Sequence, residues 1–488
     1  MLKMSSTLRG GRLASTRKEV VNFISSLHDD KRIAQATVLV NEAHVIALAK
    51  TKAIGKSEAR KLLRALRPLE NRIPTREGVE DIHVLIEEYV TRHAGQEVGG
   101  RLHLAKSRND QVVTAARMVL RNELLDVSNH LLLLEHEILR LASQHSRSVF
   151  PGYTHLQPAQ PISFAHYLLA ITDSFLRDNE RILETYRRVN VSPMGAGALA
   201  GSSITLDRAL EAELLGFEGF IANTLDAVGS RDFALETLSV LSITALDLSR
   251  LAQDIIFYSS ADVKLLDVPD EFTSTSSIMP QKKNPDPLEI IRAITAKVVG
   301  DFTAAATIMH GLPSGYNLDF QEITPLMWHS SDSLKSCFRI LTQLIPGVKL
   351  EPAIAYRTNL QYTAATEVAN ILVREEKLPF RTAHRAVGHT VRMALEEKKA
   401  LSELTHKEWE RDLGRKISKK TLASMSKALD IQKHIEYCNT KGSPNPKQTA
   451  AMILSRTCQV RLLLKENTYS RVKLKRTLTK LSSTARKI

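Results

Sequence analysis

Apolar residues recur at helical spacing over unusually long stretches in the middle of this chain. Between residues 120 and 141, the apolar positions alternate spacings of four and three, which places them on one stripe of a helix. Comparable stripes occupy residues 164–182, 234–255, 291–308 and 327–345. Five helices of about 20 to 35 residues, each with an apolar seam, are typical of a long-helix bundle. We therefore predict an all-α fold in which bundles from different subunits pack on one another.

Turn-forming residues divide the rest of the chain into shorter helical segments. Gly55 and Pro68 interrupt the first part, and Pro346 with Gly347 ends the last long helix. The predicted units are an N-terminal helical domain at 1–106, a central long-helix bundle at 107–349, a C-terminal helical domain at 350–466 and a basic tail at 467–488.

The net charge of +14 is concentrated at the two ends of the chain. The 488 residues contain 67 Lys and Arg against 53 Asp and Glu. Residues 1–18 contribute +5 and residues 467–488 contribute +7, so residues 19–466 carry only +2. Such a basic C-terminal segment is expected to be a short basic helix or a frayed tail, and a solvated tail explains it better than a nucleic-acid-binding arm does. Nucleic acid is therefore not expected as a partner.

Other classes of protein are excluded by what the sequence lacks. It contains no uninterrupted apolar run of about 18 residues, so no membrane-spanning helix is expected. Cys337, Cys438 and Cys458 lie far apart, which is typical of a protein from a reducing cytoplasm. The 16 histidines show no paired metal-ligand spacing, so no metal site is predicted.

The first long helix begins in a polar segment that extends from Gly99 to Gln111. Ser107 and Asp110 are residues that cap helices, yet Arg108 places a cation where the helix dipole disfavours one. A guanidinium beside the Asn109 amide at a helix N-terminus makes a binding site for a carboxylate. We therefore favour a binding role for this segment over a purely structural cap.

A turn rich in Pro and Gly, from Gly152 to Pro161, precedes the second long helix. Its prolines and glycine restrict the backbone, so the Thr154–His155 pair can present an imidazole to a cleft. From these residues alone, a structural role for His155 is equally consistent with the sequence.

A loop of small hydroxyl residues and lysines, from Thr275 to Asp286, precedes the fourth long helix. Loops without bulky anchors are mobile, but Pro280 and Pro285 restrict this one. Lysines beside Ser276 can bind an anion and lower the pKa of the hydroxyl. This combination favours a functional loop over a solvated one.

Together these segments resemble the three signature regions of the fumarase/aspartase superfamily, in the form found in argininosuccinate lyases. The likeness extends from Leu8 to about Pro444 and includes residues 192–201 and 315–321. Because it begins at residue 8, the basic N-terminal stretch is not expected to be a cleaved transit peptide. The resemblance implies a three-domain, all-α lyase whose long helices form a multi-helix core in a homotetramer.

The resemblance implies that the chain cleaves argininosuccinate to arginine and fumarate by anti elimination, the last step of arginine biosynthesis. No metal and no organic cofactor is implied. The chemistry needs a base for a weakly acidic proton, cations that stabilise the resulting dianion, and an acid for the departing nitrogen. The cytoplasm is the implied location.

The resemblance also implies roles for individual residues. Ser276 is the implied base, on a loop that closes over the substrate. Lys282 and Asn284 are expected to hold the carboxylate on which charge grows. His155 is expected to take part in proton transfer to the leaving nitrogen, and Glu289 to hold the His155 ring.

The remaining implied residues bind the two parts of the substrate. Those expected at the succinyl carboxylates are Arg108, Asn109 and Thr154. Those expected at the arginine portion are Ser26, Asn109, Tyr316 and Gln321. In the family each site takes residues from three subunits, which suits motifs that lie at different ends of long helices.

Several positions depart from the pattern of the family. Lys106 replaces a more usual Arg, Thr275 replaces a common Gly, and Thr324 stands where a Lys is often found, so a cation on the substrate side is missing or supplied elsewhere. One alternative is another fumarate-releasing lyase, of the adenylosuccinate type. A second alternative is a non-catalytic homologue, which the retained catalytic residues argue against.

Overall fold

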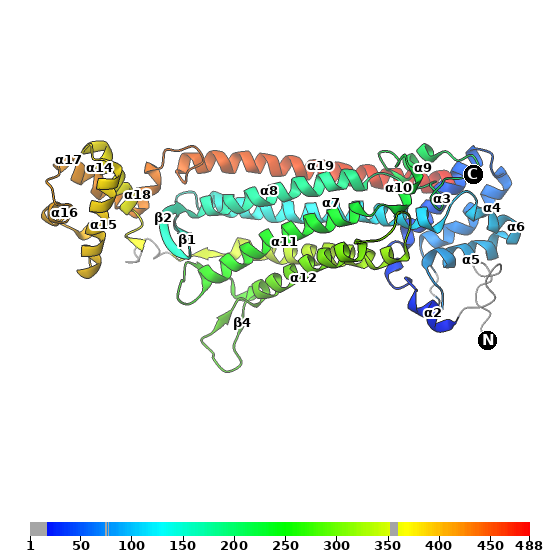
Figure 1. The fold of residues 1–488 in the computed structure, drawn as a ribbon, viewed down its shortest axis with the longest axis horizontal. Helices are drawn as coiled ribbons and strands as arrows, with labels where there is room; N and C mark the ends of the chain where they lie inside the picture. Colours follow the sequence, from blue (N-terminus) through cyan, green and yellow to red (C-terminus); the bar gives the residue numbers. More distant parts are fainter. Residues whose placement is uncertain (1–16, 74–75, 77, 352–359) are drawn as a thin grey trace.

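A bundle of five long helices forms the centre of the molecule. The computed structural model describes residues 17–73, 76, 78–351 and 360–488, so most of the basic N-terminal stretch lies outside the described residues. The bundle helices are α7 (Arg108–Gln144), α8 (Phe164–Val189), α11 (Asp232–Ser259), α12 (Asp286–Met309) and α13 (Thr324–Leu344). They lie side by side in Figure 1. The predicted all-α bundle is confirmed.

The apolar stripes of these helices are buried as their spacing predicts. Fully buried positions on α7 and α11 are Leu120, Leu124, Val127, Leu131, Leu134, Ile138, Leu238, Leu241, Ala245 and Leu248. Burying one such Leu or Val side chain contributes about 1.5–3 kcal/mol. The seams between the long helices are therefore a main source of stability.

Capping residues set where two of the bundle helices begin. The Ser107 hydroxyl accepts a hydrogen bond from the backbone N–H of Asn109 at 3.3 Å, and the Asp110 carboxylate accepts one from the Ser107 N–H at 2.9 Å. This reciprocal capping box satisfies donors that a helix start leaves unpaired. Ser163 caps α8 by accepting a hydrogen bond from the His166 N–H at 3.1 Å. The predicted N-terminal motif is thereby held at the first turn of α7.

Shorter helices surround the end of the bundle at which α7 begins. They are α2 (Lys18–Phe23), α3 (Ala34–Lys50), α4 (Lys56–Leu66), α5 (Ile82–Ala94), α6 (Gln96–Gly99), α9 (Arg208–Leu215) and α10 (Thr224–Gly229), with 3-10 turns η1 (Asp29–Arg32), η2 (Arg67–Glu70) and η3 (Gly100–His103). Their apolar side chains join those of the long helices in one hydrophobic cluster. This cluster crosses the predicted domain boundary at 106, and the division there stays a prediction.

A separate group of helices lies at the opposite end of the bundle (Figure 1). It contains α14 (Ala365–Glu375), α15 (Phe380–Glu396), α16 (His406–Leu413), α17 (Lys419–Ala428) and α18 (Ile431–His434), with η9 (Leu401–Glu403) and η10 (Ile435–Tyr437). These helices have a hydrophobic core of their own, in which Trp409 is 2% exposed. They form a compact C-terminal unit.

Three short antiparallel strand pairs interrupt the helical structure. They are β1 (Val149–Thr154) with β2 (Gln157–Ser163), β3 (Leu266–Asp267) with β6 (Lys349–Leu350), and β4 (Ser274–Thr275) with β5 (Lys283–Asn284). Further 3-10 turns are η4 (Asp270–Phe272), η5 (Leu318–Glu322) and η6 (Ile345–Gly347). The first pair shows that the predicted turn before α8 is a β-hairpin.

The basic segment at 467–488 belongs to the second half of a 42-residue helix, α19 (Pro446–Lys487), so of the two expected forms it takes the helical one. The division of the chain at 466 stays a prediction. The helix returns from the C-terminal unit along the whole bundle (Figure 1). Its buried positions Val460, Asn467, Leu474 and Leu481 recur every seven residues, so they line one face. The Asn467 amide donates a hydrogen bond to the Leu125 carbonyl at 2.8 Å. The lysines and arginines between these positions make the segment strongly basic, so its buried face was not predicted from the sequence.

Removing residues 467–488 is therefore expected to destabilise the protein. The truncation exposes the surface that Leu474 and Leu481 cover, which lowers the free energy of unfolding by roughly 3–6 kcal/mol. Chemical denaturation of the full chain and of the truncated chain measures the difference. An unchanged denaturation midpoint contradicts the structural role of this half of α19.

None of the helices in the described ranges combines the length and the apolar character that a membrane span requires.

Candidate active site

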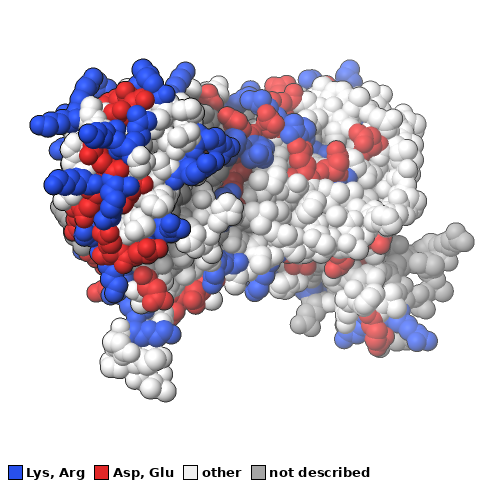
Figure 2. All heavy atoms as spheres, turned by 60° about the vertical axis from the view of Figure 1, so that its left-hand side comes forward, with Lys and Arg blue, Asp and Glu red and all other residues white. Residues whose placement is uncertain are grey.

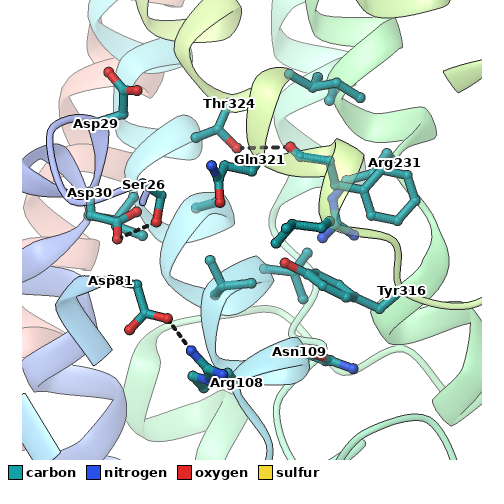
Figure 3. A pocket seen from close by; sticks show the side chains of 18 of the residues that line it. Ser26, Asp29, Asp30, Asp81, Arg108, Asn109, Arg231, Tyr316, Gln321 and Thr324 are labelled. Carbon is teal, nitrogen blue, oxygen red and sulfur yellow. Dashed lines mark hydrogen bonds and ion pairs between the residues drawn. The ribbon is translucent and has the colours of Figure 1, made fainter. Parts of the chain in front are cut away.

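A pocket lies where η1, η5 and the start of α7 and α11 meet. Five of the predicted site residues line it, namely Ser26, Arg108, Asn109, Tyr316 and Gln321. Figure 3 shows Ser26, Arg108, Tyr316 and Gln321 around a common space, whereas the Asn109 amide donates a hydrogen bond to the Ala198 carbonyl at 3.2 Å. They come from segments as far apart as residues 26 and 321, so the fold brings together what the sequence separates.

Carboxylates hold the Arg108 side chain in this pocket. Its guanidinium contacts the Asp81 carboxylate directly and lies 3.7 Å from the Glu80 carboxylate. Asp81 is itself the N-cap of α5, where it accepts a hydrogen bond from the Val84 N–H at 2.8 Å. Arg108 is thus oriented toward the pocket by an anchored acid.

The opposite wall places Ser26 against a buried acid. The Ser26 hydroxyl donates a hydrogen bond to the Asp30 carboxylate at 2.8 Å, and the Ile82 N–H donates to the same carboxylate at 3.1 Å. Burial raises the pKa of Asp30 to about 6, although both hydrogen bonds act in the other direction. The Gln321 amide donates to the Ile24 carbonyl at 3.3 Å, which ties this wall to η5.

Arg231 supplies a second cation at the pocket. Its guanidinium lies 4.4 Å from the centre of the Phe320 ring and donates to the carbonyls of Val228 and Ser230 at 3.1 and 2.8 Å. Burial lowers the pKa of Arg231 to about 10, so it stays protonated at neutral pH. Thr324, which stands where the family often has Lys, lies across the same pocket (Figure 3). Arg231 therefore supplies a cation in a pocket that lacks the usual Lys.

Sequence reasoning missed four acids and a histidine that also line the pocket. The acids are Asp29, Asp30, Glu80 and Asp81. His83 is 5% exposed, and neither of its ring nitrogens has a hydrogen-bond partner among the residues that the structure describes. Burial lowers the pKa of His83 to about 4, so its ring is neutral. The run of acids at Glu80 and Asp81 before α5 was the available signal.

Thr154 and His155 lie elsewhere, at the exposed tip of the β1–β2 hairpin. His155 and Leu156 form the turn, with φ values of 56° and 58°. Two successive left-handed residues fit a tight hairpin turn, and they are unfavourable for residues other than Gly. The imidazole is thus projected outward by a strained turn, a feature that often marks functional positions.

The predicted base also lies outside the pocket, in the loop between β4 and β5. The Ser276 hydroxyl accepts hydrogen bonds from the N–H groups of Ile278 and Met279 at 3.3 and 3.1 Å. Lys282 is exposed, and the Asn284 amide donates to the Ser274 hydroxyl at 3.5 Å. Figure 1 shows this loop projecting from the bundle. An apolar tip that includes Ile278, 86% exposed, makes the loop suited to cover another surface.

The predicted residues therefore lie at three separate places within one chain: the pocket, the tip of the β1–β2 hairpin and the β4–β5 loop. The pocket is at the start of α7, whereas the hairpin follows the end of α7, and a 37-residue helix is about 55 Å long. Glu289 is exposed in the first turn of α12, and in the described part of the chain no hydrogen bond or ion pair joins it to His155. The Glu289–His155 pair stays a prediction, as do the assigned roles.

No group of three or more His, Cys, Asp or Glu side chains suited to a metal ion occurs among the residues that the structure describes.

Known proteins resemble this chain over most of its length. The model of the family described as "Lyase" matches residues 14–300, and that of "Argininosuccinate lyase C-terminal" matches residues 362–436. Argininosuccinate lyase of Methanocorpusculum labreanum is 40% identical over 456 residues, which cover 90% of both chains. Argininosuccinate lyase of Methanothrix thermoacetophila is 41% identical over 453 residues, which cover 92% of both chains.

Solved structures share the same architecture. The crystal structure of EDDS lyase in complex with formate has a TM-score of 0.86 at 25% identity and covers 94% of this chain and 92% of its own. A class II fumarase from Schistosoma mansoni, at 17% identity, has a TM-score of 0.68 and covers 82% and 90%. This second likeness concerns the fold alone.

The long-helix bundle, the pocket for charged groups and the matched family model together define an enzyme of the lyase class. Within this class, the chain belongs to the argininosuccinate lyase family.

Proposed function

We propose that this chain cleaves argininosuccinate to arginine and fumarate as a carbon–nitrogen lyase. The observation that carries the proposal is the convergence of Ser26, Arg108, Asn109, Tyr316 and Gln321 on one pocket in a member of the family. The reaction serves arginine biosynthesis, because arginine is its product.

The charges of the pocket favour argininosuccinate over adenylosuccinate. The lining contains four carboxylates and two guanidinium groups. An acidic lining attracts the guanidinium and ammonium groups of an arginine portion, and it repels the phosphate that adenylosuccinate carries. Thr324 adds no cation for such a phosphate. The arginine portion is accordingly placed against Asp30, and a carboxylate against Arg108.

The proposed elimination breaks a C–H bond and a C–N bond and forms the double bond of fumarate. Ser276 removes the proton beside a carboxylate, and the electron pair is delocalised onto that carboxylate, where Lys282 and Asn284 stabilise it. The pair then forms the C=C bond as the C–N bond breaks. His155, held by Glu289, takes part in delivering a proton to the guanidinium nitrogen, and Thr154 binds a succinyl carboxylate. The chain's own side chains supply each of these steps.

A homotetramer with shared sites is part of the proposal. One subunit presents the pocket at one end of α7, a second presents its β1–β2 hairpin, and a third presents its β4–β5 loop. Antiparallel packing of bundles brings opposite ends of different subunits together. The cytoplasm is the proposed location, since Cys337, Cys438 and Cys458 are free thiols.

The appearance of fumarate tests the proposed reaction. Purified enzyme is incubated with argininosuccinate or with adenylosuccinate, and fumarate is followed by its ultraviolet absorbance. Fumarate is expected with argininosuccinate alone. Release from adenylosuccinate alone supports the other lyase, and release from neither identifies a non-catalytic homologue.

The pH dependence of substrate binding is expected to report Asp30. Its pKa of about 6 means that its carboxylate ionises as the pH rises through 6. A cationic arginine portion binds the ionised form better, so KM is expected to fall as the pH rises from 5 to 7. In Asp30→Asn this change is absent, while Asp29→Asn, which alters a more exposed acid nearby, retains it. Equal pH profiles of KM in the wild type and in Asp30→Asn contradict this role.

A further inference from the structure

Helix α19 carries +10 of the protein's net charge of +14. It contains eleven Lys and Arg residues and one acid, Glu466. Four of the cations form ion pairs with the bundle and with the helices around α3: Arg456 with Asp173, Arg471 with Asp126, Lys473 with Glu218 and Arg486 with Glu70. Seven others are exposed and have no ion-pair partner among the described residues: Lys447, Arg461, Lys465, Lys475, Arg476, Lys480 and Lys487.

These seven cations lie on one face of the helix. At about 100° per residue, they fall within an arc of about 140°, opposite the buried Val460, Asn467, Leu474 and Leu481. From Lys447 to Lys487 the stripe is about 60 Å long. A solvated tail does not align its charges on one face. The helix does, so the seven cations can contact one extended anionic partner together.

The C-terminal unit does not show this segregation. In the C-terminal unit, which faces the viewer in Figure 2, Lys and Arg alternate with Asp and Glu. Examples of paired cations there are Arg374 with Glu367 at 2.7 Å and Arg411 with Glu397 at 2.9 Å. Mixed signs are usual on protein surfaces, and large fields of one sign generally serve to attract a partner.

Like charges also repel one another along α19. Arg461 and Lys465 are four residues apart, as are Arg476 and Lys480. Such pairs destabilise a helix, and an anion bound between them removes the penalty. The sequence therefore maintains an arrangement that is unfavourable for the isolated helix and favourable in the presence of a polyanion.

A groove beside this stripe is lined by hydrogen-bond donors. Between α19 and α7 it presents Asn122, Asn129, Thr468, Lys475, Thr479 and Ser482. Amide, hydroxyl and ammonium groups of this kind bind the phosphate oxygens of nucleic acids. Asp126, also in the groove, is neutralised by Arg471 at 2.8 Å. The groove also contains Leu39, Val472, Leu474 and Leu478, and α19 exposes Leu454, Leu462 and Tyr469. The concentration of cations and hydrogen-bond donors is therefore what favours a phosphate backbone here.

We propose that the outer face of α19 binds the phosphate backbone of nucleic acid independently of base sequence. This inference concerns a surface remote from the candidate active site and goes beyond the proposed function. The α19 helix positions the cations, and the adjoining groove supplies the additional donors.

Fluorescence anisotropy with a fluorescein-labelled 25-base-pair DNA duplex tests the proposal, using the full chain between 50 and 300 mM NaCl. The triple variant Lys475→Gln/Arg476→Gln/Lys480→Gln is expected to bind at least tenfold more weakly at 100 mM NaCl. The slope of log K against log salt concentration is expected to fall by about 3, one for each lost phosphate contact. Lyase activity is expected to be unchanged.

A matched control separates position from net charge. The variant Lys416→Gln/Lys419→Gln/Lys420→Gln removes the same charge from exposed positions of the C-terminal unit and is expected to bind within twofold of the wild type. Equal weakening of the two variants overturns the proposal. So does the absence of wild-type binding at 100 mM NaCl, or binding to phosphatidylglycerol vesicles without binding to the duplex.

Discussion

Replacing Ser276 by Ala is expected to lower kcat by roughly a thousandfold, because proton transfer by a positioned group contributes about 10²–10⁴ to a rate. The hydroxyl lies in a loop that can reach a neighbouring pocket, and Ala cannot take the proton. Steady-state kinetics with argininosuccinate measures kcat, while KM is expected to change little, since the loss affects the transition state more than binding.

Ser277→Ala is the matched control for this change. Ser277 is the adjacent, exposed serine of the same loop. Its replacement by Ala removes one hydroxyl from the loop, as Ser276→Ala does, but leaves the proposed base in place. We expect Ser277→Ala to retain kcat within a few fold. Similar losses in both variants indicate a general effect on the loop, and an unchanged kcat in Ser276→Ala excludes this residue as the base.

Mixing two inactive variants is expected to restore activity. Ser276→Ala removes the proposed base from the β4–β5 loop, and Arg108→Ala removes one of the two cations from the pocket. If each site takes these parts from different subunits, random assembly of equal amounts leaves roughly a quarter of the sites intact. Denaturing the two variants together, refolding them and assaying fumarate release measures the recovery.

The control mixture combines Arg108→Ala with Gln321→Ala. Both residues line the same pocket of one chain, so every pocket in the mixture carries one defect. No recovery is expected from this mixture. Equal recovery in the two mixtures, or none in the first, contradicts sites shared between subunits.

The parts of the fold that the sequence predicted are those with local causes. The stripe that begins at Leu120 and the cap at Ser107 each depend on residues within a few turns, and both are as expected. The α19 seam escaped prediction because its period of seven lies within a basic segment. Asp30 and Arg231 escaped because only long-range packing brings them to Arg108. No local sequence pattern predicts that residues so far apart in the chain line the same pocket.

The tip of the β1–β2 hairpin illustrates a different limit of prediction from the sequence. Pro and Gly suggested a turn between Gly152 and Pro161, yet the turn is made by His155 and Leu156, neither of which favours the left-handed region. The sequence therefore identified the segment that turns and the histidine that it presents, although the two residues at the centre of the turn do not favour its conformation. The positions that violate local preference are frequently those that function requires.

The last residues of α19 meet the first helices of the chain. The Arg60 side chain donates to the Ile488 carbonyl at 2.6 Å, Arg486 lies 3.0 Å from Glu70, and Leu481 and Ala485 belong to the same hydrophobic cluster as α3 and α4. A ribosome makes α3 long before it makes residues 481–488 of the chain. The N-terminal core thus stays open until this part of α19 has been synthesised. Exposed apolar surface favours aggregation, so the newly made chain needs protection for as long as this helix is incomplete.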